Sequence, residues 1–182
     1  PNGVDLSFFR EIPRQEAFAR LNIKPGNYIL FCSSVSHLRR EKRYDLFRAT
    51  IEILQNKFNR DVQELILSNK PRELVPLYIN AARVHLLTSD FEGSPNSVKE
   101  ALACNIPVVS RDVGNVGKML ENLGGCYVSK CGDPQELALG VNQALQHKRI
   151  NGRQRIMDEK LDLMSTALRI KQIYTKILHE RD

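Results

Sequence analysis

The sequence has no apolar run near the roughly 20 residues that a helix needs to cross a bilayer. It opens without a signal-peptide pattern, and its cysteines are not spaced as in a zinc site. We therefore expect a cytoplasmic protein without a metal ion or other cofactor, and we interpret the thiols as reduced packing residues. They are Cys32, Cys104, Cys126 and Cys131.

Internal repeats and low-complexity tracts are also absent. The basic stretch at residues 33–43 contains no Phe, Tyr or Trp, the side chains that stack on single-stranded nucleic acid. We therefore expect no nucleic-acid partner, although a non-catalytic module that binds anions or nucleic acid stays an alternative. The net charge of +6 permits an anionic ligand or an anionic membrane surface and requires neither.

The length of 182 residues and the hydrophobic content of 42% suit one domain with its own core. The chain begins with Pro1 and not with methionine, so we expect a fragment of a longer protein. Short apolar segments alternate with helical patterns, which predicts a Rossmann-like doubly wound parallel α/β sheet with helices on both faces. Strands are predicted at 27–32, 62–68, 84–88, 106–110 and 126–129, and helices at 14–21, 44–58, 73–82, 116–123 and 134–146, before a largely helical end.

The stretch 91–109 carries the candidate site. Ser94 followed by Pro95 predicts a helix start in which Ser94 is the N-cap and the N–H groups of Asn96 and Ser97 are free. Free N–H groups and the helix dipole together favour a bound phosphate.

Two carboxylates flank this helix start, Glu92 before it and Glu100 within it. Val98, Ala101 and Leu102 share the opposite face and are expected to pack on the sheet. A phosphate site between carboxylates suits a nucleotide sugar, whose hydroxyls donate to the carboxylates while N–H groups hold its diphosphate. The alternative is that Glu92 only favours the helix dipole and that Glu100 is a solvated surface residue.

The segment from Glu92 to Glu100 resembles the Glu-(seven residues)-Glu motif of retaining glycosyltransferases of the GT-B fold, in particular those of family 4. The resemblance covers nearly the whole chain and implies that residues 1–182 are the C-terminal, donor-binding half of such an enzyme. Residues 1–10 would lead in from an absent N-terminal domain, and residues 161–182 would form the terminal helix. Three further segments resemble the family: Pro1-Asn2-Gly3-Val4-Asp5, Lys42 with Tyr44-Asp45-Leu46, and Ile173-Tyr174.

The resemblance also implies roles for the site residues. Glu92 would face the donor sugar and Glu100 the ribose, while Lys42 would neutralise the leaving diphosphate. The other residues implied to bind the donor are Gly93, Ser94 and Pro95, beside the sugar, and Asn96 and Ser97, whose N–H groups would reach the diphosphate.

This chain departs from the family pattern in two places. Where the family has a glycine and then an arginine after the first strand, this chain has Ser33 and Ser34, so the second cation stays open among His37, Arg39 and Arg40. The segment between the second and third predicted strands is also short, so we expect one strand of the family to be missing.

The implied function is the transfer of a hexosyl group from a nucleoside-diphosphate sugar to a glycan or lipid-linked acceptor. The acceptor would be held by the missing N-terminal domain, so we expect the isolated chain to bind the donor and to be inactive. A sugar-nucleotide epimerase or another GT-B enzyme stays an alternative because it shares the donor site. A glycosidase also uses paired carboxylates, but it needs neither an open helix N-terminus nor Lys42.

Two further features invite interpretation. His85 lies in an apolar segment, and we interpret it as a structural histidine and not as a base. A basic patch near the end of the chain is interpreted as a solvated face, or as a contact with the inner face of a membrane that carries lipid-linked acceptors. Its residues are Lys148, Arg149, Arg153 and Arg155.

Overall fold

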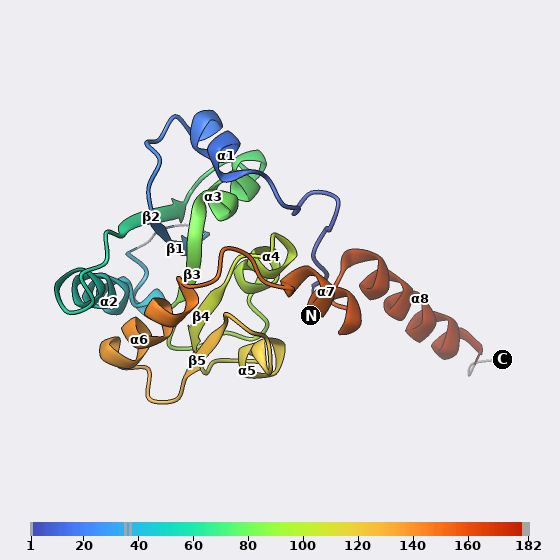
Figure 1. Cartoon of the computed structure of the whole chain (residues 1–182). Coiled ribbons are helices and arrows are strands. Elements are labelled where there is room, and N and C mark those ends of the chain that lie inside the picture. The colour runs from blue at the N-terminus through green and yellow to red at the C-terminus, as the bar shows by residue number, and fades with distance from the viewer. Residues whose placement is uncertain (1, 35, 37, 180–182) are drawn as a thin grey trace.

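The computed structural model describes residues 2–34, 36 and 38–179 (Figure 1). Its centre is a five-stranded parallel sheet in the order β2-β1-β3-β4-β5. The boundaries of all five strands lie within two residues of those predicted from the sequence. The strands are β1 (Tyr28–Ser33), β2 (Gln63–Ser68), β3 (Ala82–Leu87), β4 (Val108–Arg111) and β5 (Tyr127–Ser129).

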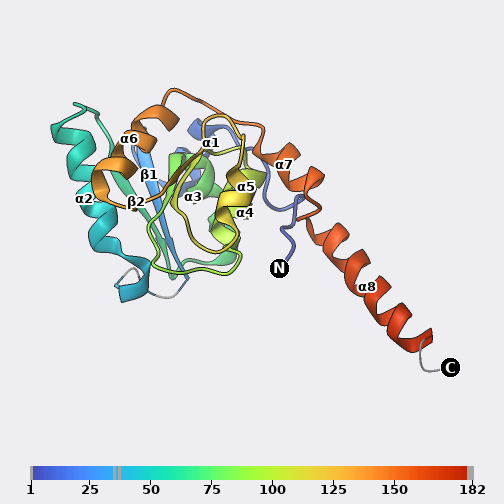
Figure 2. The same cartoon turned by 90° about the horizontal axis from the view of Figure 1, so that it is seen from below.

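Helices cover both faces of the sheet, so the predicted Rossmann-like doubly wound fold is confirmed. Helices α2 and α6 pack on one face, and α1, α3, α4 and α5 lie on the other (Figure 2). The helices are α1 (Arg14–Leu21), α2 (Tyr44–Asn56), α3 (Val75–Ala81), α4 (Asn96–Ala103), α5 (Val116–Leu120), α6 (Pro134–Ala144), α7 (Gly152–Asp158) and α8 (Leu163–His179). Two short 3₁₀ helices, Arg40–Lys42 and Arg72–Leu74, precede α2 and α3.

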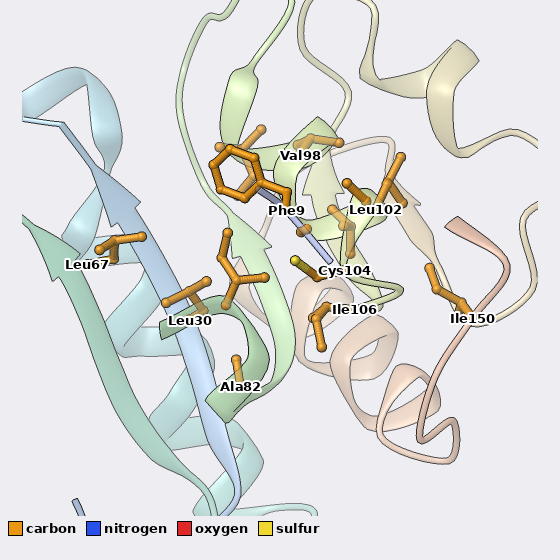
Figure 3. Close-up of a cluster of buried hydrophobic side chains, with 14 of the residues drawn as sticks. Phe9, Leu30, Leu67, Ala82, Val98, Leu102, Cys104, Ile106 and Ile150 are labelled. Atoms are coloured by element: carbon orange, nitrogen blue, oxygen red, sulfur yellow. The ribbon is translucent and has the colours of Figure 1, made fainter. Parts of the chain in front are cut away.

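Alternation along the strands divides the core between the two faces. In β1, Phe31 belongs to the cluster under α2 and α6, whereas Leu30 belongs to the larger cluster on the other face (Figure 3). The α4 face that was predicted to pack on the sheet, formed by Val98, Ala101 and Leu102, is fully buried in that larger cluster. Packing of this face turns the N-terminus of α4 toward the carboxyl ends of the strands.

The start of α4 differs from the prediction by one residue. Pro95, and not Ser94, is the N-cap, because the Lys99 N–H donates to the Pro95 carbonyl at 3.4 Å and Pro95 has extended backbone angles. The Ser94 hydroxyl therefore lies too early in the chain to cap the helix. It is buried and finds no hydrogen-bond partner among the described residues.

Ser94 and Asp133 should consequently respond differently to truncation. The Asp133 carboxylate accepts from the N–H groups of Gln135 and Glu136, at 2.8 and 3.0 Å, and caps α6. Asp133→Ala should lower the urea midpoint of unfolding, because two N–H groups of α6 lose their acceptor. Ser94→Ala should be neutral or slightly stabilising, because it removes a buried hydroxyl that has no partner. Urea unfolding of both variants measures the difference, and a loss for Ser94→Ala equal to that for Asp133→Ala would contradict this assignment.

The segment before α1 meets the segment before α8. The Val4 N–H donates to the Leu161 carbonyl and the Leu163 N–H donates to the Val4 carbonyl, both at 2.9 Å, which makes a parallel bridge. A Cβ on Gly3 would lie 2.5 Å from the Asp162 carbonyl oxygen, so glycine permits this close approach. Residues 2–4 and 161–163 are thus held together, and we refer to this contact as the terminal bridge.

Lys99 ties the terminal bridge to α4. Its side chain is 1% exposed, and its ammonium donates to the Asn2 carbonyl at 2.6 Å. Pro1, part of the segment that resembled the family, lies outside the described residues.

Helix α8 extends away from the domain (Figures 1 and 2). Apolar side chains along α8 are exposed: Leu163 is 53% exposed, Ile170 49%, Tyr174 65% and Ile177 45%. Among the described residues, no helix is both long and apolar enough to span a membrane.

Most of the predicted basic patch is not a solvated face. Arg153 donates to three backbone carbonyls and Arg149 to two, at 3.2 Å or less, and Arg155 donates to one. Arg149 and Arg153 join the segment before α1 to the end of α4, because their acceptors are the carbonyls of Leu6, Phe9, Ile12, Ala103 and Cys104. Lys148 remains exposed.

Candidate functional site

A pocket of about 470 Å³ opens where β1, β2 and β3 end and α4 begins. The strand order reverses between β1 and β3, which is where α/β sheets of this kind bind ligands. Six of the predicted site residues line this pocket: Lys42, Glu92, Pro95, Asn96, Ser97 and Glu100. Gly93 and Ser94 lie beside it and do not line it.

Lys42 and Glu92 form an ion pair across the mouth of the pocket. Lys42 Nζ lies 2.6 Å from Glu92 Oε1, and the two side chains are only 19% and 17% exposed. The same oxygen of Glu92 accepts from the Ser89 hydroxyl at 2.8 Å. The Thr88 hydroxyl donates to the Lys42 carbonyl at 2.8 Å and so fixes the basic loop against the end of β3. The sequence predicted separate roles for these two charges, and the structure shows that they form an ion pair with each other.

The first turn of α4 faces the same pocket. The N–H groups of Asn96, Ser97 and Val98 have no acceptor in the described part of the chain, as expected for the first positions of a helix. Together with the helix dipole they form a site of positive potential next to the ammonium of Lys42. This arrangement suits an anionic group such as a phosphate.

His85 connects this helix start to the centre of the sheet. It is fully buried, with Nδ1 3.2 Å from the Leu30 carbonyl oxygen and Nε2 3.1 Å from the Ser97 hydroxyl. A carbonyl oxygen can only accept, so Nδ1 carries the proton, Nε2 accepts, and the Ser97 hydroxyl donates. Burial lowers the pKa of His85 to about 4, with Glu92 opposing and Lys42 assisting, so the ring is neutral at pH 7. The structural role predicted for His85 agrees with this geometry, and Ser97 has only its N–H left to donate toward the pocket.

The lowered pKa of His85 should make the free energy of unfolding depend on pH. Below a pH of about 6.5 an unfolded histidine takes up a proton, whereas folded His85 stays neutral until about pH 4. Its contribution to stability is therefore complete above pH 6.5 and declines as the pH falls toward 4, because the unfolded state then binds more protons. Urea unfolding between pH 4 and 7 should show this slope in the wild type and a smaller slope in His85→Gln. The exposed His147 offers the control His147→Gln, which should keep the full slope; an unchanged slope in His85→Gln would refute the prediction.

Glu100 lines the same pocket from α4, further along the helix than Asn96 and Ser97. Burial raises the pKa of its carboxyl group, and the positive charges of Arg72 and Lys99 oppose that rise. Arg72 lines the same pocket, with its guanidinium 5.2 Å from the ring centroid of Phe8. The carboxyl group therefore has cations nearby in a largely buried setting.

Of the three candidates for the second cation, the structure places two outside the pocket. Arg39 and Arg40 line a separate hollow, and Arg39 is paired with Glu41; His37 lies outside the described residues. Lys70 and Arg72, which follow β2, line the pocket instead. No pattern in the sequence around residues 68–72 singles out these two side chains.

The fold and the pocket define a Rossmann-like domain with a pocket at the switch point of its sheet. Residues 50–160 match the family described as glycosyl transferases group 1, and the chain belongs to this family. A segment of 75 residues is 33% identical to the amylovoran biosynthesis glycosyltransferase AmsK of Erwinia amylovora and covers 38% of this chain and 18% of that protein.

Solved structures of glycosyltransferases share the fold. A sucrose-phosphate synthase from Thermosynechococcus elongatus superposes with a TM-score of 0.80 at 20% identity, over 99% of this chain and 52% of that one. Anabaena HepE, solved with UDP and glucose, gives a TM-score of 0.72 at 16% identity, over 96% of this chain and 55% of that one. The C-terminal domain of the group 1 protein LpcC from Francisella tularensis gives 0.70 at 17% identity, over 86% of this chain and 97% of that domain.

The chain thus spans about half the length of the two larger structures and nearly all of an isolated C-terminal domain. The predicted C-terminal domain of a GT-B glycosyltransferase is confirmed at the level of family and fold.

Proposed function

We propose that this domain binds the nucleoside-diphosphate sugar of a retaining, family-4-type hexosyltransferase. The observation that carries the proposal is that the open N-terminus of α4, Lys42, Glu92 and Glu100 all line one pocket at the switch point of the sheet. The complex of HepE with UDP and glucose, a protein of the same fold, supports a nucleotide sugar as the ligand.

Each contact in the pocket suits one part of such a donor. The N–H groups of Asn96 and Ser97 would bind the diphosphate, and Lys42 would neutralise the charge that develops on it as the sugar departs. Glu92, at the mouth, would accept from the hydroxyls of the transferred sugar, with the backbone at 93–95 beside it. Glu100, which lines the pocket from α4, would accept from the ribose hydroxyls.

The base would lie toward the loop after β2. Asn69, Lys70 and Arg72 line that side of the pocket, next to the end of β1. An exposed polar loop of this kind can contact the edge of a base while the strands close the other side.

The acceptor is proposed to bind on an N-terminal domain that this sequence does not contain, so residues 1–182 alone would bind the donor without transferring the sugar. A glycan or a lipid-linked sugar is the proposed acceptor class. Contact with an anionic membrane surface stays a prediction, and Lys148 is the cation of the patch whose side chain remains exposed for it.

Calorimetric titration with UDP, GDP and ADP tests the proposal. One nucleotide should bind saturably, and Glu100→Ala should weaken it about tenfold, the effect of losing one hydrogen bond to a charged group. Glu52→Ala is the matched control, because Glu52 is 63% exposed on α2, away from the pocket. The absence of saturable binding at millimolar concentration, or equal affinities for wild type and Glu100→Ala, would contradict the proposal.

A further inference from the structure

A second hollow, of about 620 Å³, lies at the opposite end of the sheet from the donor pocket. None of the described residues lines both hollows. Arg83 comes from the start of β3, whose other end leads to Glu92, and Arg14 comes from the start of α1. The hollow is lined by Glu11, Ile12, Pro13, Arg14, Arg83, Lys148 and Arg149.

This hollow carries an excess of positive charge. Four of its side chains are cationic, and Glu11 is its one carboxylate. Glu11 is shared, because one oxygen lies 3.7 Å from Arg149 Nε and the other accepts from the Asn105 amide at 2.5 Å. Burial lowers the pKa of Arg14, and repulsion from Arg83 and Arg149 lowers it further. The cations are therefore close enough to repel one another.

Some of the cationic side chains in the hollow already donate to backbone carbonyls. Arg149 donates to two carbonyls and faces Glu11, and Arg14 donates to the carbonyls of Gly26 and Ala81. These contacts explain why Arg14 and Arg149 are present, because they attach the segment around α1 to the sheet. They do not explain Arg83 and Lys148.

The Nε–H group of Arg83 is the donor that most directly indicates a ligand. Its Nη2 donates to the Leu145 carbonyl at 2.6 Å, but its Nε is buried and finds no acceptor among the described residues. A buried N–H without a partner is uncommon and destabilising, and it often marks the place of an absent ligand or water. Lys148, which is exposed, lines the same hollow and adds an ammonium group to it.

We propose that this hollow binds a phosphate group, either that of a soluble phosphate ester or that of a lipid headgroup. A tetrahedral anion with two negative charges would accept from Lys148 and, once the atoms that cover it move aside, from Arg83 Nε. It would also offset the repulsion among the guanidinium groups. The site is independent of the donor pocket, so the proposal holds whether or not the domain binds a nucleotide sugar.

NMR detection of arginine Nε–H groups tests the site directly. Inorganic phosphate is titrated into ¹⁵N-labelled protein at constant ionic strength, with chloride replaced step by step. The Arg83 Nε–H signal should shift saturably. Shifts that follow ionic composition without saturation, or that leave Arg83 unmoved, would overturn the proposal.

Variants distinguish specific binding of phosphate from a general effect of positive charge. Arg83→Lys keeps the charge and removes Nε, so it should weaken phosphate about tenfold, as followed at Arg14 Nε–H. Arg20→Lys makes the same change on α1, where Arg20 is 55% exposed and paired with Glu16, and should have no effect. Should Arg83→Lys fail to fold, Lys148→Gln replaces an exposed side chain and should weaken phosphate as well. Wild-type affinity in both Arg83→Lys and Lys148→Gln would overturn the proposal.

The source of the phosphate is decided by sedimentation with vesicles of phosphatidylcholine containing phosphatidic acid. Binding that free phosphate displaces and that Arg83→Lys reduces supports the site and assigns it to a headgroup. Saturable binding of phosphate without vesicle binding supports the site and assigns it to a soluble phosphate ester.

Discussion

Gly114→Ala is expected to destabilise the domain by about 3 kcal/mol, the sum of a left-handed backbone penalty and a steric clash. Gly114 has a φ of +56°, where residues with a side chain are strained. An added Cβ would fall against the Gly93 carbonyl oxygen and lie 2.5 Å from that of Glu92. Both neighbours are backbone atoms and cannot rotate away.

Gly114→Ala should also disturb the candidate site. The Gly93 carbonyl accepts from the Asn115 N–H at 3.1 Å, so the loop after β4 supports the loop that carries Glu92. Displacing that loop would separate Glu92 from Lys42. We therefore expect weaker nucleotide binding by whatever protein remains folded.

Urea unfolding and nucleotide titration of Gly114→Ala measure these two effects. Gly124→Ala is the matched control, since a Cβ there meets no atom within 4 Å. Equal stability of the two variants would show that the loop after β4 adapts to a side chain without cost.

Lys42→Gln is expected to weaken nucleoside diphosphate binding by about 100-fold, the upper range for a charge-assisted hydrogen bond. Two effects add in this variant. The ammonium that would bind the diphosphate is lost, and Glu92 keeps a negative charge that would then face the diphosphate unpaired. The second effect follows from the 2.6 Å pair between these side chains.

Removing both charges should restore part of the affinity. In Lys42→Gln/Glu92→Gln the repulsion is absent, so binding should be stronger than in Lys42→Gln alone and weaker than in the wild type. Lys57→Gln, at an exposed position after α2, is the control for net charge. Binding by the double variant as weak as by Lys42→Gln would mean that Glu92 does not act on the ligand through this pair.

Features encoded by neighbouring residues were predictable from the sequence. The strands appear as short apolar segments, and Asp133-Pro134 starts α6 because the carboxylate and the N–H groups that it caps lie within three residues. Ser94-Pro95 has the same pattern but a different outcome, since the first helical hydrogen bond goes to the Pro95 carbonyl. Packing of α4 on the sheet decides that register, and the local pattern does not contain it.

Features that depend on strand order and register were not predictable in the same way. Lys70 and Arg72 reach the pocket because β2 lies beside β1. His85 contacts Ser97 because α4 packs on the sheet with its first turn next to β3. The motif from Glu92 to Glu100 and Lys42 could be selected because they match a family pattern, but their pairing needs the three-dimensional arrangement.

The terminal bridge has a mechanical consequence for α4. Helix α8 continues directly from residues 161–163 and projects from the domain. A force on its exposed end therefore acts on the terminal bridge. Lys99 belongs to α4, and its hydrogen bond to the Asn2 carbonyl connects this helix to the bridge. A rotation of α8 would therefore be transmitted as a small displacement of α4, whose first turn lines the candidate site.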